Sequence, residues 1–192
     1  MLLKNDLITV ASLNVGQRRI IGQWAGKPVE SAIARESVGF QRLALNHDGL
    51  EGDEQVDRSV HGGSQKAVYV YPYEHYAAWE RELGQSLEPG AFGENVTVLG
   101  ALEADVRVGH IFLWGNAAVR VVKYRQPCIK LNLHRDTPDM IQRMRANGRC
   151  GWYLEVLVPG HVSMTAPMML MGGLDEGQPS IAELFRQKFP NS

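Results

Sequence analysis

The sequence predicts one mostly β domain: a closed or nearly closed β-barrel with a few short helices and a C-terminal helix. Three observations predict this class. Many short β-type runs are separated by glycine turns. The regular alternation of strand and helix that marks a doubly wound sheet is missing. A length of 192 residues favours a single domain with one core.

The strands are predicted from apolar runs and from alternation. The first covers residues 7–13 and ends at the turn signal Asn14-Val15-Gly16. The clearest is 152–158, where successive residues alternate with the period of two that a strand requires. Further strands are predicted at 30–35, 41–45, 67–71, 95–99, 111–114, 117–122 and 168–171.

Two helices are predicted inside the barrel sequence. Pro72 opens a helix over 72–83, and Gly84 is placed to end it. Thr137 caps a second helix, whose first position is Pro138 and which Gly148 ends.

The last predicted helix begins at Ser180, with Glu183 at the spacing of a capping box. Residues 1–171 are therefore assigned to the barrel, and 172–192 to a C-terminal loop and helix. The apolar stripe of that helix packs either on the barrel or on a second subunit of a possible homodimer.

Bulk composition excludes several classes of function. The net charge of −1, from 20 basic and 21 acidic residues, argues against a nucleic-acid binder. No apolar run is long enough to span a membrane, so a cytoplasmic location is expected. The two cysteines form no Cys-x-x-Cys pair, which argues against structural zinc and iron–sulfur clusters.

The densest polar segment is 49–63, between two predicted strands. Asp53 and Asp57 could accept hydrogen bonds from a ligand, and His61 is the one histidine embedded in such a loop. Gly62 and Gly63 permit positive φ and could turn N–H groups toward an anion. An ordinary turn is the alternative for each residue, but the density of the cluster favours a site.

A second segment, 89–95, leads into a predicted strand. Two glycines flank Phe92 and are followed by Glu94 and Asn95, which could present a carboxylate and an amide at the strand start. Taken alone, this segment favours a simple turn.

Cys128 is the leading candidate for chemistry. It follows Pro127 after a strong predicted strand, and Arg125 and Lys130 are near enough in sequence to stabilise its thiolate. A thiolate suits a soft metal or an electrophile. The alternative is a small buried core residue, which is how we interpret Cys150.

Four segments together resemble the MOSC domain, the family named for the C-terminal domain of molybdenum cofactor sulfurase. They occur in the family's order between about residues 6 and 160, and the similarity is closest to the small stand-alone bacterial branch linked to protection against N-hydroxylated bases. The segments are GLEGDEQVDRSVHGGSQKAVYVYPYEHYAAW, PGAFGENVTV, RQPCIKLN and GWYLEVLVPG.

The resemblance implies a MOSC-type, pyruvate kinase β-barrel-like fold and a molybdenum–pterin cofactor (Mo-molybdopterin), with Cys128 as metal ligand and catalytic residue. Arg125 and Lys130 would offset the negative charge of the thiolate and of the pterin phosphate. The remaining expected cofactor or substrate contacts are Asp53, Asp57, His61, Gly62, Gly63, Lys66, Glu94 and Asn95.

The expected activity is molybdenum-dependent reduction of N-hydroxylated compounds such as hydroxylaminopurines. The chain carries no nicotinamide or flavin fingerprint, so a separate flavoprotein reductase is expected to supply electrons. Two alternatives stay open: a carrier of molybdenum cofactor, or of sulfur as a Cys128 persulfide, and a hydrolase with a Cys–His pair.

Overall fold

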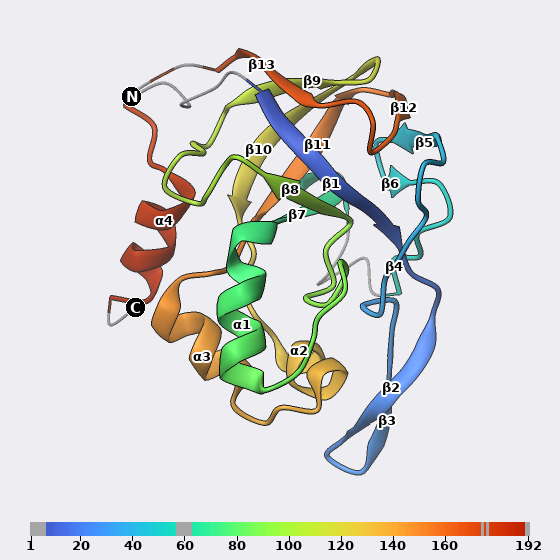
Figure 1. Cartoon of the computed structure of the whole chain (residues 1–192), viewed down its shortest axis with the longest axis vertical. Coiled ribbons are helices and arrows are strands. Elements are labelled where there is room, and N and C mark those ends of the chain that lie inside the picture. The colour runs from blue at the N-terminus through green and yellow to red at the C-terminus, as the bar shows by residue number, and fades with distance from the viewer. Residues whose placement is uncertain (1–6, 57–62, 174, 176, 191–192) are drawn as a thin grey trace.

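Seven strands close into a mixed β-barrel. The computed structural model describes residues 7–56, 63–173, 175 and 177–190. Around the barrel the strand order is β13-β9-β10-β11-β7-β8-β1, and a pairing of β1 with β13 completes the ring (Figure 1). These strands are β1 (Leu7–Val15), β7 (Val68–Pro72), β8 (Val96–Leu99), β9 (Ile111–Trp114), β10 (Ala117–Tyr124), β11 (Trp152–Val158) and β13 (Met168–Gly172).

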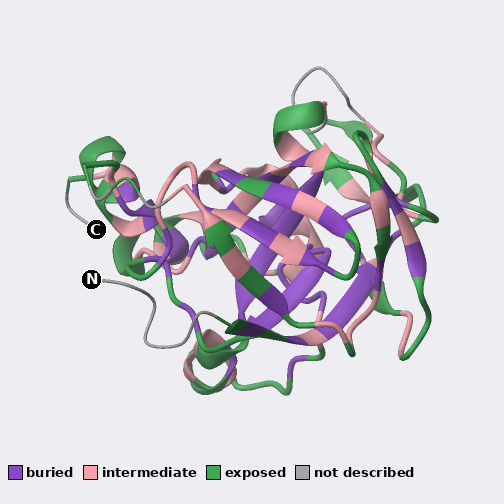
Figure 2. Cartoon of the chain, turned by 90° about the horizontal axis from the view of Figure 1, so that it is seen from above, coloured by how far each residue is buried: buried purple, intermediate pink, exposed green. Residues whose placement is uncertain are grey.

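The core fills the inside of this ring, because each barrel strand turns alternate apolar residues inward. Cross-strand neighbours such as Val70 and Trp152, or Val119 and Phe112, are buried and share that face. Figure 2 shows buried stretches along the crossing strands of the barrel. The mostly β barrel with a C-terminal helix, predicted from the sequence, is confirmed.

One strand pair departs from the antiparallel pattern. β7 and β8 run parallel, so the chain between them must cross over. The crossover contains a 3₁₀ turn, η2 (Tyr73–His75), then helix α1 (Tyr76–Leu83), which ends at Gly84 in the left-handed conformation, as expected from its sequence. As a result β7 is buried on both faces: Val68 and Val70 face the barrel interior, and Tyr69 lies on the other side.

Outside the ring lie short strands and helices. β4 (Glu36–Ser37) pairs antiparallel with the end of β1, and a small separate sheet is formed by β5 (Leu43–Asn46), β6 (Gly49–Leu50) and β12 (Gly160–Val162). β2 (Arg19–Trp24) and β3 (Lys27–Ser31) form a hairpin that projects from the body in Figure 1. The helices are η1 (Ser64–Lys66), α2 (Ile129–Arg135), α3 (Met140–Asn147) and α4 (Ile181–Lys188).

Three local expectations need correction. The strand predicted at 30–35 ends at Ser31, because the following residues turn away and Arg35 binds Asp53. The second helix begins at Met140 rather than Pro138. A helix over Ile129–Arg135 was not expected; the buried Asn132 side chain joins it to α3 by bonding the Pro138 carbonyl and the Ile141 amide.

The C-terminal helix packs against the barrel within the chain. The capping box predicted at Ser180 forms, with the Glu183 amide donating to Ser180 Oγ at 3.1 Å. Phe185 is buried and its ring lies edge-on to Tyr124 of β10, with centroids 5.3 Å apart. The proposed division at residue 171 and the possible homodimer stay predictions. Among the described residues, no helix combines the length and the apolar character that crossing a membrane needs.

Candidate functional site around Cys128

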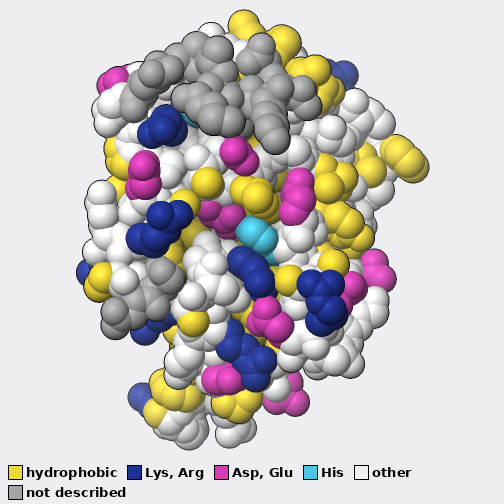
Figure 3. All heavy atoms as spheres, turned by 60° about the vertical axis from the view of Figure 1, so that its left-hand side comes forward, with side chains coloured by type: hydrophobic (Ala, Val, Ile, Leu, Met, Phe, Trp, Pro, Cys, Tyr) yellow, Lys and Arg dark blue, Asp and Glu magenta, His cyan; other side chains and the backbone are white. Residues whose placement is uncertain are grey.

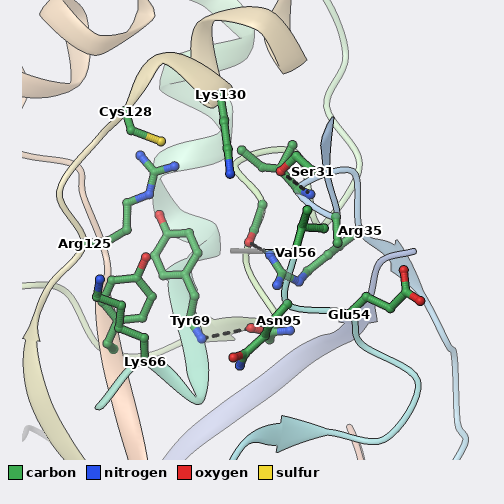
Figure 4. A pocket seen from close by; sticks show the side chains of 15 residues that line it. Ser31, Arg35, Glu54, Val56, Lys66, Tyr69, Asn95, Arg125, Cys128 and Lys130 are labelled. Atoms are coloured by element: carbon green, nitrogen blue, oxygen red, sulfur yellow. Dashed lines mark hydrogen bonds between the residues drawn. The ribbon is translucent and has the colours of Figure 1, made fainter. Parts of the chain in front are cut away.

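Cys128 lies at the junction between β10 and α2. Pro127 disfavours helical geometry at Gln126, so the chain leaves β10 extended. Cys128 is also extended, with φ −135° and ψ 170°, and its carbonyl accepts the amide of Leu131 at 2.9 Å to start α2. Its side chain is partly exposed and lines a pocket that the Arg125 and Lys130 side chains also enter (Figure 4).

The pocket lies on the outer face of the barrel, where β10 ends and β11 and β7 begin. Lys123, Tyr153 and Tyr69 are successive cross-strand partners and form a row on that face. Asn95 continues the row, because its amide donates to the Tyr69 carbonyl at 2.8 Å and its Oδ1 accepts the Tyr69 amide at 3.0 Å. The polar row therefore depends on strand register that only the closed barrel defines.

The pocket walls come from segments that are far apart in the sequence. The segment after β3, the segment after β6 and the N-terminal end of α2 meet above the outer face of the sheet. The lining residues are Ser31, Ala32, Ile33, Arg35, Glu54, Gln55, Val56, Lys66, Tyr69, Gly93, Asn95, Arg125, Cys128, Lys130 and Tyr153.

Arg125 is a buried cation, 4% exposed. Its guanidinium lies 5.5 Å from the centre of the Tyr69 ring, and Nη1 is 3.8 Å from the sulfur of Met144. Among the described residues no carboxylate forms an ion pair with it. Burial alone would lower the pKa of Arg125, but Tyr69 and Cys128 together with neighbouring groups outweigh burial and raise that pKa. A buried charge of this kind calls for a negative partner, which a Cys128 thiolate or an anionic ligand would supply.

Arg35 brings a second cation to the pocket, and Asp53 holds it there. Two parallel bonds of 2.8 Å join the Arg35 guanidinium to the Asp53 carboxylate. The same carboxylate accepts the Gly16 amide and the Asn95 side-chain amide, each at 2.9 Å. Asp53 is thus occupied by protein donors behind the pocket wall, where it positions Arg35 and Asn95.

Glu94, like Asp53, lies behind the pocket wall and supports it. Its fully buried carboxylate accepts hydrogen bonds from the Gly90 and Phe92 amides and from the Thr97 and Tyr76 hydroxyls. Burial raises the pKa of Glu94 even though these donors oppose the rise. The carboxylate holds the turn that brings Gly93 and Asn95 to the pocket.

The predicted site residues therefore fall into four groups. Cys128, Lys66, Asn95, Arg125 and Lys130 line one pocket. Asp53 and Glu94 lie behind its walls. Gly63 has the positive φ expected of it, 88°, outside the lining set. Asp57, His61 and Gly62 lie outside the described residues.

Sequence reasoning missed Arg35, Tyr69 and Tyr153. The tyrosines carried a usable signal, since Tyr69 and Tyr153 are aromatic residues on the face of their strands that does not point into the barrel. Arg35 carried none, because its role depends on Asp53, 18 positions later.

A second hollow adjoins the first at Cys128. Cys128, Lys66 and Tyr153 line both hollows, so the two meet at these residues. The second has a volume of about 340 Å³, against about 70 Å³ for the first. The other lining residues are Lys123, Tyr124, Gln126 and Pro127.

The donor set fits a metal that arrives with ligands of its own. Among the described residues no group of three or more His, Cys, Asp and Glu side chains could chelate a bare ion. One thiol beside Arg125, Lys130 and Arg35 instead suits an anionic, sulfur-ligated metal complex, with Cys128 adding one soft ligand. On the face shown in Figure 3, basic and acidic side chains are interspersed.

Comparison with known proteins gives the family. The MOSC domain model matches residues 57–168, more than half of the chain. The chain therefore belongs to the MOSC domain family.

Within that family, it is similar to small stand-alone bacterial members. It is 44% identical over 154 residues to Protein YiiM of Escherichia coli, covering 79% of this chain and 67% of that protein. It is 37% identical over 175 residues to YflK of Bacillus subtilis, covering 91% and 78%. The crystal structure of YiiM from Geobacillus stearothermophilus has a TM-score of 0.78 at 32% identity, covering 95% of this chain and 84% of that one.

A fungal relative matches this chain over only a small part of its own length. A Gibberella moniliformis protein named Reductase is 35% identical over 156 residues, which are 78% of this chain but only 27% of that protein.

Proposed function

We propose that this protein is a molybdenum-cofactor-dependent reductase of N-hydroxylated compounds such as hydroxylaminopurines. The observation that carries the proposal is the position of Cys128, where two hollows meet and beside Arg125, a buried cation with no carboxylate partner among the described residues. Membership of the MOSC family and the fungal relative named Reductase support the same class of chemistry.

The first hollow would hold the molybdenum end of the cofactor, because a volume of about 70 Å³ is too small for the whole of Mo-molybdopterin. Cys128 would ligate the molybdenum, and Arg125, Lys130 and Arg35 would neutralise the negative charge of the thiolate and of the pterin phosphate. Asn95 would form part of the pocket wall beside the cofactor, held there because its side-chain amide donates to Asp53 and Asn14 and its Oδ1 accepts the Tyr69 amide. Asp53 and Glu94 act from behind, by keeping these groups in place.

The overall reaction breaks the N–O bond of the substrate and consumes two electrons and two protons, giving the amine or amidine and water. When bound, the cofactor supplies the two-electron chemistry. The chain orients the substrate against the cofactor and partly excludes water. We propose that a separate flavoprotein reductase delivers the electrons and that the protein works in the cytoplasm.

Metal and pterin analysis tests the proposal. Protein made in a host that synthesises the cofactor should contain molybdenum and the fluorescent oxidised pterin, at up to one of each per chain. With reduced methyl viologen in place of the reductase, it should convert N6-hydroxyadenine to adenine. Folded protein that contains neither metal nor pterin would contradict the proposal. Loaded protein that does not turn over would favour the carrier alternative instead.

A further inference from the structure

The second hollow is built by an irregularity in the sheet. Val121 pairs with Leu154, so an unbroken ladder would place Val122 opposite Tyr153. The register shifts between Val121 and Lys123, and Lys123 takes that place instead. Such irregularities next to sites re-aim a side chain. Here an apolar residue is replaced by a cation beside Cys128.

The lining of this hollow is cationic and aromatic. Lys66 and Lys123 contribute two ammonium groups, and no carboxylate is among the described residues that line it. Tyr124 and Tyr153 contribute rings, and Gln126 an amide. The Tyr124 ring packs edge-on against the Phe185 ring of α4, which helps to hold it in place. A planar ligand with an anionic group matches this chemistry, because rings pack on rings and phosphate binds lysine.

We propose that the second hollow is the substrate pocket and that it prefers N-hydroxylated purine nucleotides to the free base or nucleoside. The inference rests on the proposed function, which puts the reacting centre at Cys128. The purine lies beside Tyr153 and Tyr124, and Lys123 and Lys66 bind the 5′-phosphate. The volume of about 340 Å³ is in the range of small-molecule sites.

The test compares N6-hydroxyadenosine with its 5′-monophosphate. Cofactor-loaded protein is assayed with reduced methyl viologen, and kcat/KM is measured for both compounds. Calorimetry on the same sample gives both dissociation constants without turnover. We expect the wild-type protein to prefer the monophosphate in both measurements.

Variants assign the preference to the hollow. Lys123→Gln should reduce the monophosphate-to-nucleoside ratio by roughly fivefold, as expected for one partly exposed ion pair. Lys123→Arg keeps the positive charge and should retain the ratio. Lys27→Gln changes an exposed lysine on the projecting hairpin and should leave the ratio unaltered.

Two outcomes would overturn the inference: equal binding of nucleoside and monophosphate by the wild-type protein, or an unchanged ratio in Lys123→Gln. A preference seen only in cofactor-free protein would also overturn it, since the lysines would then serve the cofactor. None of these three outcomes is the same as a failure of the proposed function. A protein with no molybdenum and no turnover would refute the function, while calorimetry would still report on the hollow.

Discussion

At the residue scale, the two cysteines differ in access to solvent. Cys150 is fully buried, its sulfur lies 3.3 Å from the Gly151 carbonyl, and burial raises the pKa of its thiol well above the ordinary value. It therefore stays protonated and inert at neutral pH. Cys128 is partly exposed at the junction of two hollows. Of the two thiols, we therefore expect Cys128 to be the reactive one.

Replacing Cys128 with serine should remove most of the reductase activity. The hydroxyl is rarely ionised near neutral pH and is a harder ligand than thiolate, while the cationic walls would still retain much of the pterin. We expect kcat per bound molybdenum to fall at least about tenfold, since even outer-shell changes cost 10–100-fold. Turnover with excess reduced viologen, normalised to metal content, measures this.

Cys150→Ser is the matched control and should keep its activity per molybdenum, because a hydroxyl can replace the thiol near the Gly151 carbonyl. Near-normal turnover by Cys128→Ser would remove the ligand assignment. Loss of turnover in a folded, metal-loaded Cys150→Ser protein would mean that the other cysteine is the ligand.

Substitution of Arg125 should affect cofactor binding without lowering the stability of the cofactor-free protein. Replacing this buried cation with methionine removes a charge that has no carboxylate partner among the described residues, so the cofactor-free protein should not lose stability. Pterin retention should weaken by roughly ten- to a hundredfold, because a hydrogen bond to a charged group contributes about 1.5–3 kcal/mol. Urea denaturation and pterin fluorescence after dialysis measure the two effects.

Arg143→Met is the control, because Arg143 is on the surface, paired with Asp139 at 2.9 Å. It should alter neither property appreciably. If Arg125→Met lowered the stability of the cofactor-free protein and left pterin retention intact, Arg125 would be a structural residue only.

At the scale of elements, α2 concentrates positive charge beside the pocket. It carries Lys130 and Arg135, and His134 lies next to Arg135. The pKa of His134 is lowered to about 4, first by burial and then by four arginines, Arg135, Arg19, Arg35 and Arg125. His134 is therefore neutral in the folded protein at pH 7, and its proton uptake on acidification is suppressed by folding.

His134 should make the protein less stable in mild acid. Between pH 6.5 and 4 the unfolded chain protonates this histidine and the folded chain does not, so stability falls as the pH falls. The contribution is at most roughly 3 kcal/mol across that window. Urea denaturation of wild type and His134→Gln at pH 7 and pH 4.5 measures it.

The His134→Gln protein should lose less stability on acidification than the wild type does. His161→Gln, at an exposed position of β12, serves as the control and should keep the wild-type pH dependence. Parallel pH profiles for wild type and His134→Gln would show that His134 titrates normally in the folded state.

At the scale of the whole molecule, barrel closure depends on a short seam. β1 and β13 share two paired positions, Leu7 with Met169 and Ile8 with Met168. The inward members, Ile8 and Met168, are each 1% exposed. Closure therefore relies on the buried side chains at the seam as well as on the ladder hydrogen bonds.

Ile8→Ala should destabilise the protein by about 2–4 kcal/mol, the usual cost of a cavity in a packed core. Ile20→Ala makes the same chemical change on the projecting hairpin, where Ile20 is 64% exposed, and should stay within about 0.5 kcal/mol of wild type. Equal effects in urea denaturation would contradict the placement of the core inside the ring.

The sequence determined the elements whose signals are local. Alternation along 152–158 and the apolar runs at 7–13 and 111–114 all became strands, because strand periodicity is set within a few residues. Gly84 and Ser180 marked helix ends correctly, because capping depends on neighbours in the chain. Cys128 was predicted as a site residue from its Pro-Cys context and adjacent cations, and it lines a pocket in the structure.

The tertiary structure decided what depends on residues distant in the chain. Asp53 faces Arg35 and Asn95 instead of an open site, and Glu94 supports a turn, because closure brings protein donors to both carboxylates. A register shift in one strand pair places Lys123 beside Cys128. Neither effect has a local signature: which groups meet is fixed by strand register and by the closed ring, which no short segment specifies alone.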